Sequence, residues 1–237
     1  MKTVIFLGAG ASKADGAPLQ AELFKAYFTE LRRPGPSVPH EMERELATFF
    51  LLLFQINVDH ADLNLVEFPT FEEALGIIDL AESRMESFKD FDLLNFASNS
   101  NRLGFMRQYL VMLMVKIIDA KLRTSRGIHR RLIKNLQQKN LLASTIFVTT
   151  NYDILTDNAL AALNPQNPYD GIDYGIEFDH VRSNAITNRS AIPKLFKLHG
   201  SLNWLYCPTC ASITLTPGEK GIIRLVENFS QAACPPL

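Results

Sequence analysis

The residues that decide the fold stand at the N-terminus, where residues 2–7 read KTVIFL and residues 8–12 read GAGAS. The first stretch is short, apolar and rich in β-branched and aromatic side chains, which predicts a buried strand of a parallel sheet. The second stretch breaks the strand with two glycines, and a helical pattern begins near Pro18. A strand, a glycine turn and a helix together form a phosphate-binding arrangement, because glycine lets the backbone approach an anion closely.

The glycines also have a simpler interpretation, in which Gly8 and Gly10 only turn a strand into a helix. The dinucleotide-binding pattern G-x-G-x-x-G is incomplete, since Lys13 stands where the third glycine belongs. An ordinary dehydrogenase would next require a second strand that ends in an acidic ribose ligand, about 20 residues further on. A helical pattern occupies that position instead, so Glu30 is a poor candidate and a dehydrogenase is disfavoured.

A long segment, from about residue 21 to residue 140, has helical periodicity and is predicted to be a helical insertion. The helices are expected over residues 21–33, 41–56, 74–88, 101–123 and 128–139. Thr70 and Glu73 have the spacing of a capping box ahead of the third helix. The fourth helix has an apolar face, which indicates packing rather than a cofactor site. That face consists of Leu103, Met106, Leu110, Leu113, Met114 and Ile117.

The composition excludes several classes of protein. The 237 residues carry 24 basic and 25 acidic side chains, and 47% are hydrophobic, so intrinsic disorder is excluded and a soluble globular protein is expected. No apolar run is long enough to span a bilayer, and the N-terminus leads into glycines rather than a cleavage site. We therefore expect a cytoplasmic protein that has no membrane partner. One basic segment has no interleaved aromatic residues, so a solvated helix face is favoured and a nucleic-acid partner is not expected. It contains Arg123, Arg126, Arg130, Arg131 and Lys134.

Two further predicted strands also end in polar residues. Residues 144–150, STIFVTT, lead into Asn151 and Asp153, and residues 194–198, KLFKL, lead into His199. Ligands of open α/β sheets bind at the carboxyl ends of the strands. Each residue has an alternative interpretation, since Asn151 and Asp153 suit a cap of the helix that follows, and a lone histidine is more often structural. Because all three strands end in ligand-competent residues, the sequence predicts a site at this edge.

The chain resembles the Sir2 superfamily in four motifs that occur in the same order. They are GAGAS over residues 8–12, TTNYD over residues 149–153, KLHGS over residues 197–201 and CPTC over residues 207–210. The variants and the helical insertion are more similar to the bacterial SIR2-like branch than to the protein deacylases. That branch occurs in antiphage defence systems and hydrolyses NAD. The resemblance implies an α/β fold, with a Rossmann-like and mainly parallel sheet in one NAD-binding domain over residues 1–237.

The resemblance also implies roles for individual residues. Asn151 would hold the hydroxyls of the nicotinamide ribose and order a water, and Asp153 would hydrogen-bond the nicotinamide carboxamide. His199 would be the base that acts on a ribose hydroxyl or on the attacking water. The residues that bind the rest of NAD would be Gly8, Ala9, Gly10, Ser12 and Thr150.

Departures from the sirtuin pattern favour hydrolysis of NAD to nicotinamide and ADP-ribose. Deacylases continue their glycine loop into G-I-P-D-F-R, whose aromatic and arginine side chains shield the reacting ribose, whereas residues 16–21 read GAPLQA here. The segments that hold an acyl-lysine peptide and the adenine half of NAD are also missing, so a C-terminally truncated chain is expected. An NAD-dependent protein deacylase and a non-catalytic module that binds NAD or ADP-ribose remain alternatives. A second copy of the chain and a defence-system protein are the candidate protein partners.

The three cysteines suggest a metal more than a disulfide. Cys207 and Cys210 have C-x-x-C spacing, and together with Cys234 they resemble three ligands of a structural zinc site. No cysteine follows Cys234, so truncation, a degenerate site or another ligand such as His180 are all open explanations. A small cysteine-bearing lobe is expected over about 202–237, with ordinary reduced thiols as the alternative to bound zinc.

Overall fold

The chain is mixed α/β and divides into two compact units. Its computed structural model describes residues 2–32, 40–60, 62–84, 86, 88, 102–166, 171–178, 192–206, 209 and 211–215, without the side chains of residues 40–42 and 102. Of these, a sheet unit holds the described residues of 2–17 and 121–215, and a helical unit holds those of 18–120.

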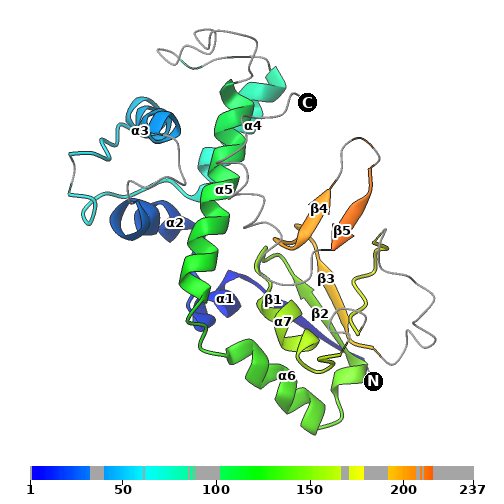
Figure 1. The fold of residues 1–237 in the computed structure, drawn as a ribbon. Helices are drawn as coiled ribbons and strands as arrows, with labels where there is room; N and C mark the ends of the chain where they lie inside the picture. Colours follow the sequence, from blue (N-terminus) through cyan, green and yellow to red (C-terminus); the bar gives the residue numbers. More distant parts are fainter. Residues whose placement is uncertain are drawn as a thin grey trace. The chain divides into compact units, whose positions relative to one another are not determined.

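The sheet unit is built on three parallel strands in the order β1 (Thr3–Leu7), β2 (Thr145–Thr149) and β3 (Lys194–Lys197) (Figure 1). Leu7 lies opposite Thr149, and Thr149 lies opposite Lys197, so the three strands end at the same edge. All three predicted strands are therefore confirmed, and so is their parallel arrangement. The residues that follow each strand are brought to one side of the sheet.

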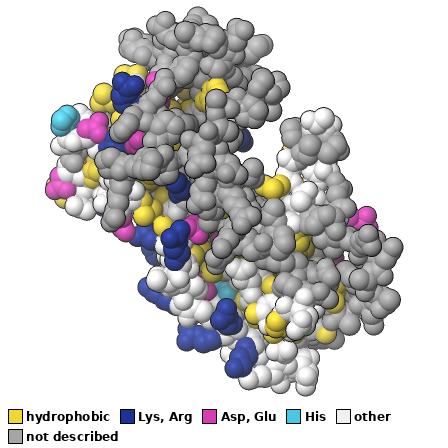
Figure 2. All heavy atoms as spheres, viewed as in Figure 1, with side chains coloured by type: hydrophobic (Ala, Val, Ile, Leu, Met, Phe, Trp, Pro, Cys, Tyr) yellow, Lys and Arg dark blue, Asp and Glu magenta, His cyan; other side chains and the backbone are white. Residues whose placement is uncertain are grey.

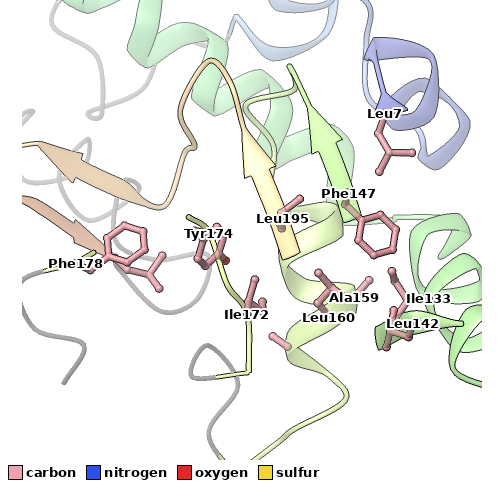
Figure 3. Packing of buried hydrophobic residues seen from close by; sticks show 12 residues of the cluster. Leu7, Ile133, Leu142, Phe147, Ala159, Leu160, Ile172, Tyr174, Phe178 and Leu195 are labelled. Carbon is pink, nitrogen blue, oxygen red and sulfur yellow. The ribbon is translucent and has the colours of Figure 1, made fainter. Parts of the chain in front are cut away.

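One face of the sheet is covered by α6 (Ile128–Gln138) and α7 (Leu155–Ala161). Phe147 of β2 and Leu195 of β3 are completely buried and pack with Ile133 of α6 (Figure 3). Burial of a large apolar side chain contributes about 1.5–3 kcal/mol, so this layer holds the strand ends in place. The helix predicted over 128–139 thus belongs to the sheet unit rather than to the helical unit.

Only one face of β1 is buried, which corrects the prediction of a buried strand. Val4 is 63% exposed and Phe6 is 61% exposed, whereas Leu7, on the other face, is 8% exposed. The reason is the layering, because the helices α6 and α7 pack on the face that carries Leu7, while Val4 and Phe6 alternate to the opposite face. The apolar pattern of a strand records its composition and not its position among its neighbours.

A short helix, α1 (Ala9–Asp15), begins directly after Gly8, so the predicted glycine loop before a helix near Pro18 is wrong. Gly16 ends α1 with φ of 111°, a left-handed conformation that favours glycine. The amide of Gly16 donates to Lys13 O at 3.0 Å, and the next helix, α2 (Gln20–Ala26), follows four residues later.

The end of α1 is tied to the start of α6 by the buried carboxylate of Asp15. This carboxylate accepts hydrogen bonds from the amides of Ile128 and His129, at 2.9 and 3.0 Å, and from the Ser125 hydroxyl at 2.9 Å. It also pairs with His129 Nδ1 at 2.5 Å. Burial raises the pKa of Asp15, but these hydrogen bonds outweigh burial and hold the pKa well below its ordinary value.

The chain after β3 forms an antiparallel hairpin of β4 (Trp204–Tyr206) and β5 (Ile213–Leu215). Trp204 packs edge-to-face against Tyr174, with 5.7 Å between the ring centroids. The lobe predicted over about 202–237 is described only in part, and its zinc ligands stay predictions. The residues concerned, Cys207, Cys210, Cys234 and His180, lie outside the described residues.

The helical unit contains most of the helices predicted between 21 and 123, with some differences in their bounds. After α2 come a π-helical turn (Tyr27–Leu31), α3 (His40–Phe54), α4 (Phe71–Arg84) and α5 (Arg102–Leu122). The capping box is confirmed, since Thr70 N donates to Glu73 Oε2 at 2.7 Å and Glu73 N donates to Thr70 Oγ1 at 3.1 Å. The six predicted apolar residues of α5 are all buried.

Aromatic side chains are prominent in the core of the helical unit. Phe24 and Phe50 are fully buried with their ring centroids 4.8 Å apart, and Phe28 stacks on Phe68 at 5.5 Å. Edge-to-face and offset aromatic pairs of this kind add about 0.5–1.5 kcal/mol beyond their buried area.

The surface shows how the charges are distributed. The basic residues predicted to lie on a solvated helix face are exposed, among them Arg130, Arg131 and Lys134 of α6, and Lys and Arg side chains gather over this part of the molecule (Figure 2). Among the described helices, none combines the length and the apolar character needed to cross a membrane.

Candidate functional site

Two of the predicted motifs meet at the carboxyl edge of the sheet. The side-chain amide of Asn151 donates from Nδ2 to the backbone oxygen of Gly8 at 2.8 Å and to Ser12 Oγ at 2.7 Å. Asn151 follows β2, whereas Gly8 and Ser12 follow β1, so these contacts join segments that are far apart in sequence. The structure thereby brings the glycine motif and the Asn-Tyr-Asp motif together.

These contacts also determine how the Asn151 amide is oriented. A backbone carbonyl can only accept a hydrogen bond, so the amide nitrogen and not the amide oxygen must face Gly8. Both amide hydrogens are then used within the protein. The amide oxygen, which can only accept, has no hydrogen bond among the described residues.

The side chain of Asp153 is buried, and two protein groups donate hydrogen bonds to it. Its Oδ2 accepts the Ser12 hydroxyl at 2.5 Å, and its Oδ1 accepts the amide of Leu155, the first residue of α7, at 3.0 Å. Asp153 is not the cap of the following helix, because Ile154 occupies the N-cap position, but its carboxylate binds the first backbone amide of α7. Asn151 does not share that role, since its side chain contacts Gly8 and Ser12 instead.

Ser12 and Thr149 connect the two strand ends from within. Ser12 is 4% exposed, and it both accepts from Asn151 and donates to Asp153. Thr149 donates from Oγ1 to Leu7 O at 2.8 Å, and the same oxygen accepts the backbone N–H of Asn151 at 3.0 Å. The sequence did not single out Thr149 as a site residue, although a threonine at an inward-facing strand end is the available signal.

His199 lies in a turn after β3, on the exposed side of the same edge. The amide of Gly200 closes this turn onto Lys197 O at 3.3 Å, and Gly200 has φ of 80°, which favours glycine. The His199 ring lies 5.9 Å from the Tyr152 ring, measured between centroids. Among the described residues, His199 joins the site through this contact and not through a hydrogen bond to Asn151 or Asp153.

The structure does not require glycine at either position of the glycine motif. Gly8 has φ of −96° and ψ of −173°, which any residue adopts, and Gly10 lies within α1 without a positive φ. Among the described residues, a Cβ atom on Gly10 would have no neighbour within 4 Å, and one on Gly8 would meet only a Phe6 ring atom at 4.0 Å. The interpretation that these glycines merely turn the chain is therefore not supported by the backbone.

The predicted NAD-binding residues differ in exposure. Ala9 and Gly10 are exposed, Gly8 and Thr150 are half-buried, and Ser12 is buried. The exposed backbone of Ala9 and Gly10 follows Gly8, whose carbonyl oxygen accepts the side-chain amide of Asn151. Within the part of the chain that the structure describes, no group of three His, Cys, Asp or Glu side chains is placed to hold a metal ion.

A buried ion pair below the site was not predicted from the sequence. Lys197 Nζ lies 2.9 Å from Asp157 Oδ2, and neither side chain is exposed to solvent. The signal was a lysine at an inward-facing position of a strand whose neighbour on that face, Leu195, is completely buried. Its partner on α7 could not be identified from sequence separation alone.

Comparisons with models of known protein families and with curated proteins found no match for this chain.

Proposed function

We propose that this chain is an NAD hydrolase of the Sir2 superfamily, which converts NAD and water to nicotinamide and ADP-ribose. One observation carries the proposal: Asn151 and Asp153 are hydrogen-bonded to the Gly8–Ser12 segment at the sheet edge where β3 leads into His199. In this proposal, β1, β2 and β3 belong to a Rossmann-like sheet that binds NAD along its carboxyl edge.

The glycines support a ligand that approaches the backbone closely. Glycine costs roughly 0.5–1 kcal/mol relative to alanine within a helix, and neither backbone conformation nor packing in the described structure accounts for it at Gly10. The dinucleotide of NAD would lie against the exposed backbone of Ala9 and Gly10. A side chain at Gly10 would occupy the space that the ligand takes.

The proposed reaction breaks the bond between C1′ of the ribose and the nicotinamide nitrogen. Nicotinamide leaves with the bonding electron pair as a neutral molecule, so its departure needs no general acid. The transition state resembles an oxocarbenium ion and is stabilised by polar groups that are oriented in advance. Asn151 fits this requirement, because two hydrogen bonds fix its amide and leave its oxygen for a ribose hydroxyl.

His199 would remove a proton from a ribose hydroxyl or from the water that attacks C1′. General base assistance of this kind contributes about 10²–10⁴-fold to rate. The water oxygen forms the new bond to C1′, and the imidazole passes the proton to solvent. Asp153 would accept a hydrogen bond from the carboxamide of nicotinamide. A carboxylate has about four acceptor positions, and Ser12 and Leu155 use two of them.

The resemblance to the bacterial SIR2-like branch also supports a proposal for the role of the protein in the cell. We propose a cytoplasmic effector that depletes NAD in antiphage defence, together with a second copy of the chain or a defence-system protein as its partner. A structural zinc ion held by the cysteines belongs to this proposal as well.

The test is incubation of the purified chain with NAD, with nicotinamide and ADP-ribose followed by chromatography. We expect the parent chain to release both, and His199→Ala and Asn151→Ala to lower the rate by about 100-fold or more. His60→Ala and Asn135→Ala are matched controls, since both residues are exposed and neither lies at the sheet edge. They should keep the parent rate.

Three results would contradict the proposal. A parent chain that releases no nicotinamide excludes the hydrolase, and a His199→Ala chain at the parent rate excludes the assigned base. An acetylated peptide that loses its acetyl group as nicotinamide appears would replace hydrolysis with deacylation.

A further inference from the structure

Lys197 is a charged residue in the interior of the sheet unit. Its side chain is completely shielded from solvent, and its neighbours on the same face of the strands include Leu195 and Thr149. An ammonium group is costly to bury, and an apolar side chain of similar volume often stabilises a core equally well. Packing alone therefore does not explain why a lysine occupies this position.

The two described hydrogen bonds of Lys197 Nζ show what the ammonium group holds. One goes to Asp157 Oδ2 of α7 at 2.9 Å, and the other goes to the backbone oxygen of Asp153 at 2.5 Å. The second bond reaches the loop that carries the site residues Asn151 and Asp153. The donor comes from β3, 44 residues further along the chain, so the bond ties this loop to the neighbouring strand.

Lys197 also stands at the start of the turn that delivers His199. Its backbone oxygen accepts the Gly200 amide at 3.3 Å, and the amide of the next residue, Leu198, donates to Thr149 O at 2.9 Å. The side chain of Lys197 thus binds the Asn151–Asp153 loop, while its backbone oxygen accepts the amide that closes the turn at His199.

The acceptor of the ammonium group is itself held in place. Asp157 is completely buried, and its Oδ1 accepts the Tyr174 hydroxyl at 2.9 Å. Tyr174 in turn packs against Trp204 of β4. Because both oxygens of Asp157 are engaged, α7 provides a fixed anchor for Nζ.

We propose that Lys197 is a positioning residue that sets the distance between the Asn151–Asp153 loop and His199. It is too deeply buried to touch a substrate and acts through the Asp153 carbonyl and the turn at Gly200. The inference rests on the proposed function, since it names a residue that supports the same site.

The test is the double variant Lys197→Met/Asp157→Asn. It leaves no unpaired charge in the core, and the amide side chain introduced on α7 would still offer an oxygen to the Tyr174 hydroxyl. We expect this chain to fold and to melt close to the parent, with kcat for nicotinamide release reduced at least 10-fold and KM for NAD within threefold. A role in stability alone would not produce such a split between kcat and KM.

The matched control is Lys194→Met, on the same strand. Lys194 also pairs with a carboxylate, that of Asp173 at 3.4 Å, but it lies at the far end of β3 and its side chain is 38% exposed. This variant should keep the parent kcat and KM.

A second readout does not depend on turnover. In the double variant, the amides of Leu155 and Leu202, which donate to Asp153 and Tyr152, should exchange with solvent at least 10-fold faster, while the Phe147 amide of β2 keeps its parent rate. Unchanged exchange at Leu155 and Leu202, an unchanged kcat, or a double variant that does not fold would each overturn the positioning role. If the parent releases no nicotinamide, the proposed function fails, and the exchange rates alone decide whether Lys197 holds the loop.

Discussion

Gly10 is the residue whose replacement best separates the needs of a ligand from the needs of the fold. Alanine fits its helical backbone and meets no described neighbour within 4 Å. We expect Gly10→Ala to raise the free energy of unfolding by up to about 1 kcal/mol, yet to lower NAD turnover at least 10-fold. Thermal melting and nicotinamide release measure the two effects on the same sample.

Gly76→Ala provides the control for this substitution. Gly76 also lies within a helix, α4, and its Cβ would likewise have no described neighbour within 4 Å. It should gain similar stability and keep the parent turnover. If Gly10→Ala also keeps full turnover, no ligand approaches the backbone at this residue.

The site residues show which kinds of information a sequence carries. Gly8, Asn151 and His199 were predicted because each follows an apolar strand, and strand ends can be located from local composition. Lys197 and Asp157 were missed because they form an ion pair across 40 residues of sequence, and no local pattern predicts such a contact. The same limit applies to Asp153, because its bond to Ser12 joins residues 141 positions apart in the sequence.

At the scale of elements, the junction between α1 and α6 is the feature with the clearest dependence on pH. The pKa of Asp15 lies below its ordinary value in the folded chain, so its carboxylate stabilises the fold above the ordinary pKa of 3.8. This stabilisation of the folded state is lost as the pH falls from about 3.8 through the lower pKa that Asp15 has in the folded chain. We expect Asp15→Asn to cost on the order of 3 kcal/mol at neutral pH, because it removes charged hydrogen bonds from a buried site.

Urea unfolding at several pH values checks this expectation, with Trp204 fluorescence as the signal. The stability difference between parent and Asp15→Asn should shrink as the pH drops below about 4. Asp79→Asn is the comparison, since Asp79 forms an exposed pair with Arg107 and should change stability by less than about 1 kcal/mol. A difference for Asp15→Asn that does not vary with pH would mean that its carboxylate charge does not hold the junction.

The elements that were predicted well are those with strong local patterns. The apolar face of α5 and the capping box before α4 depend on spacings of three and four residues, which can be read directly from the sequence. The start of α1 was missed, because residues 8–15 contain two glycines and no apolar periodicity. This helix is held by its contacts with α6 and by Gly16 rather than by its own propensity.

At the scale of the whole molecule, the two units have separate cores. Phe50 packs among aromatic side chains of the helical unit, whereas Phe147 packs against α6 and α7 in the sheet unit. The chain has one tryptophan, Trp204, and it lies in the sheet unit, so its fluorescence reports on that unit. Circular dichroism reports mainly on the helical unit, because that unit contains the long helices α3, α4 and α5. The two cores can therefore be followed by two different signals.

We expect Phe50→Ala to lower the urea midpoint seen by circular dichroism and to leave the fluorescence midpoint nearly unchanged. Phe147→Ala should move the fluorescence midpoint instead, since either change costs about 3–5 kcal/mol in the core that it affects. Equal shifts of both signals in both variants would show that the two units unfold as one.

The edge strand β1 has a consequence for how the chain is made. Thr149, which pairs with Leu7 at the end of this strand, lies 142 residues further along the chain. At a synthesis rate of about 5–20 residues per second, the pairing partner of β1 is synthesised roughly 7–28 s after β1 itself. During that time Val4, Ile5, Phe6 and Leu7 form an uncharged stretch with high strand propensity, the kind of segment that nascent chains aggregate through. The N-terminal strand is thus the segment of the described sheet most dependent on chaperones while the rest of the chain is translated.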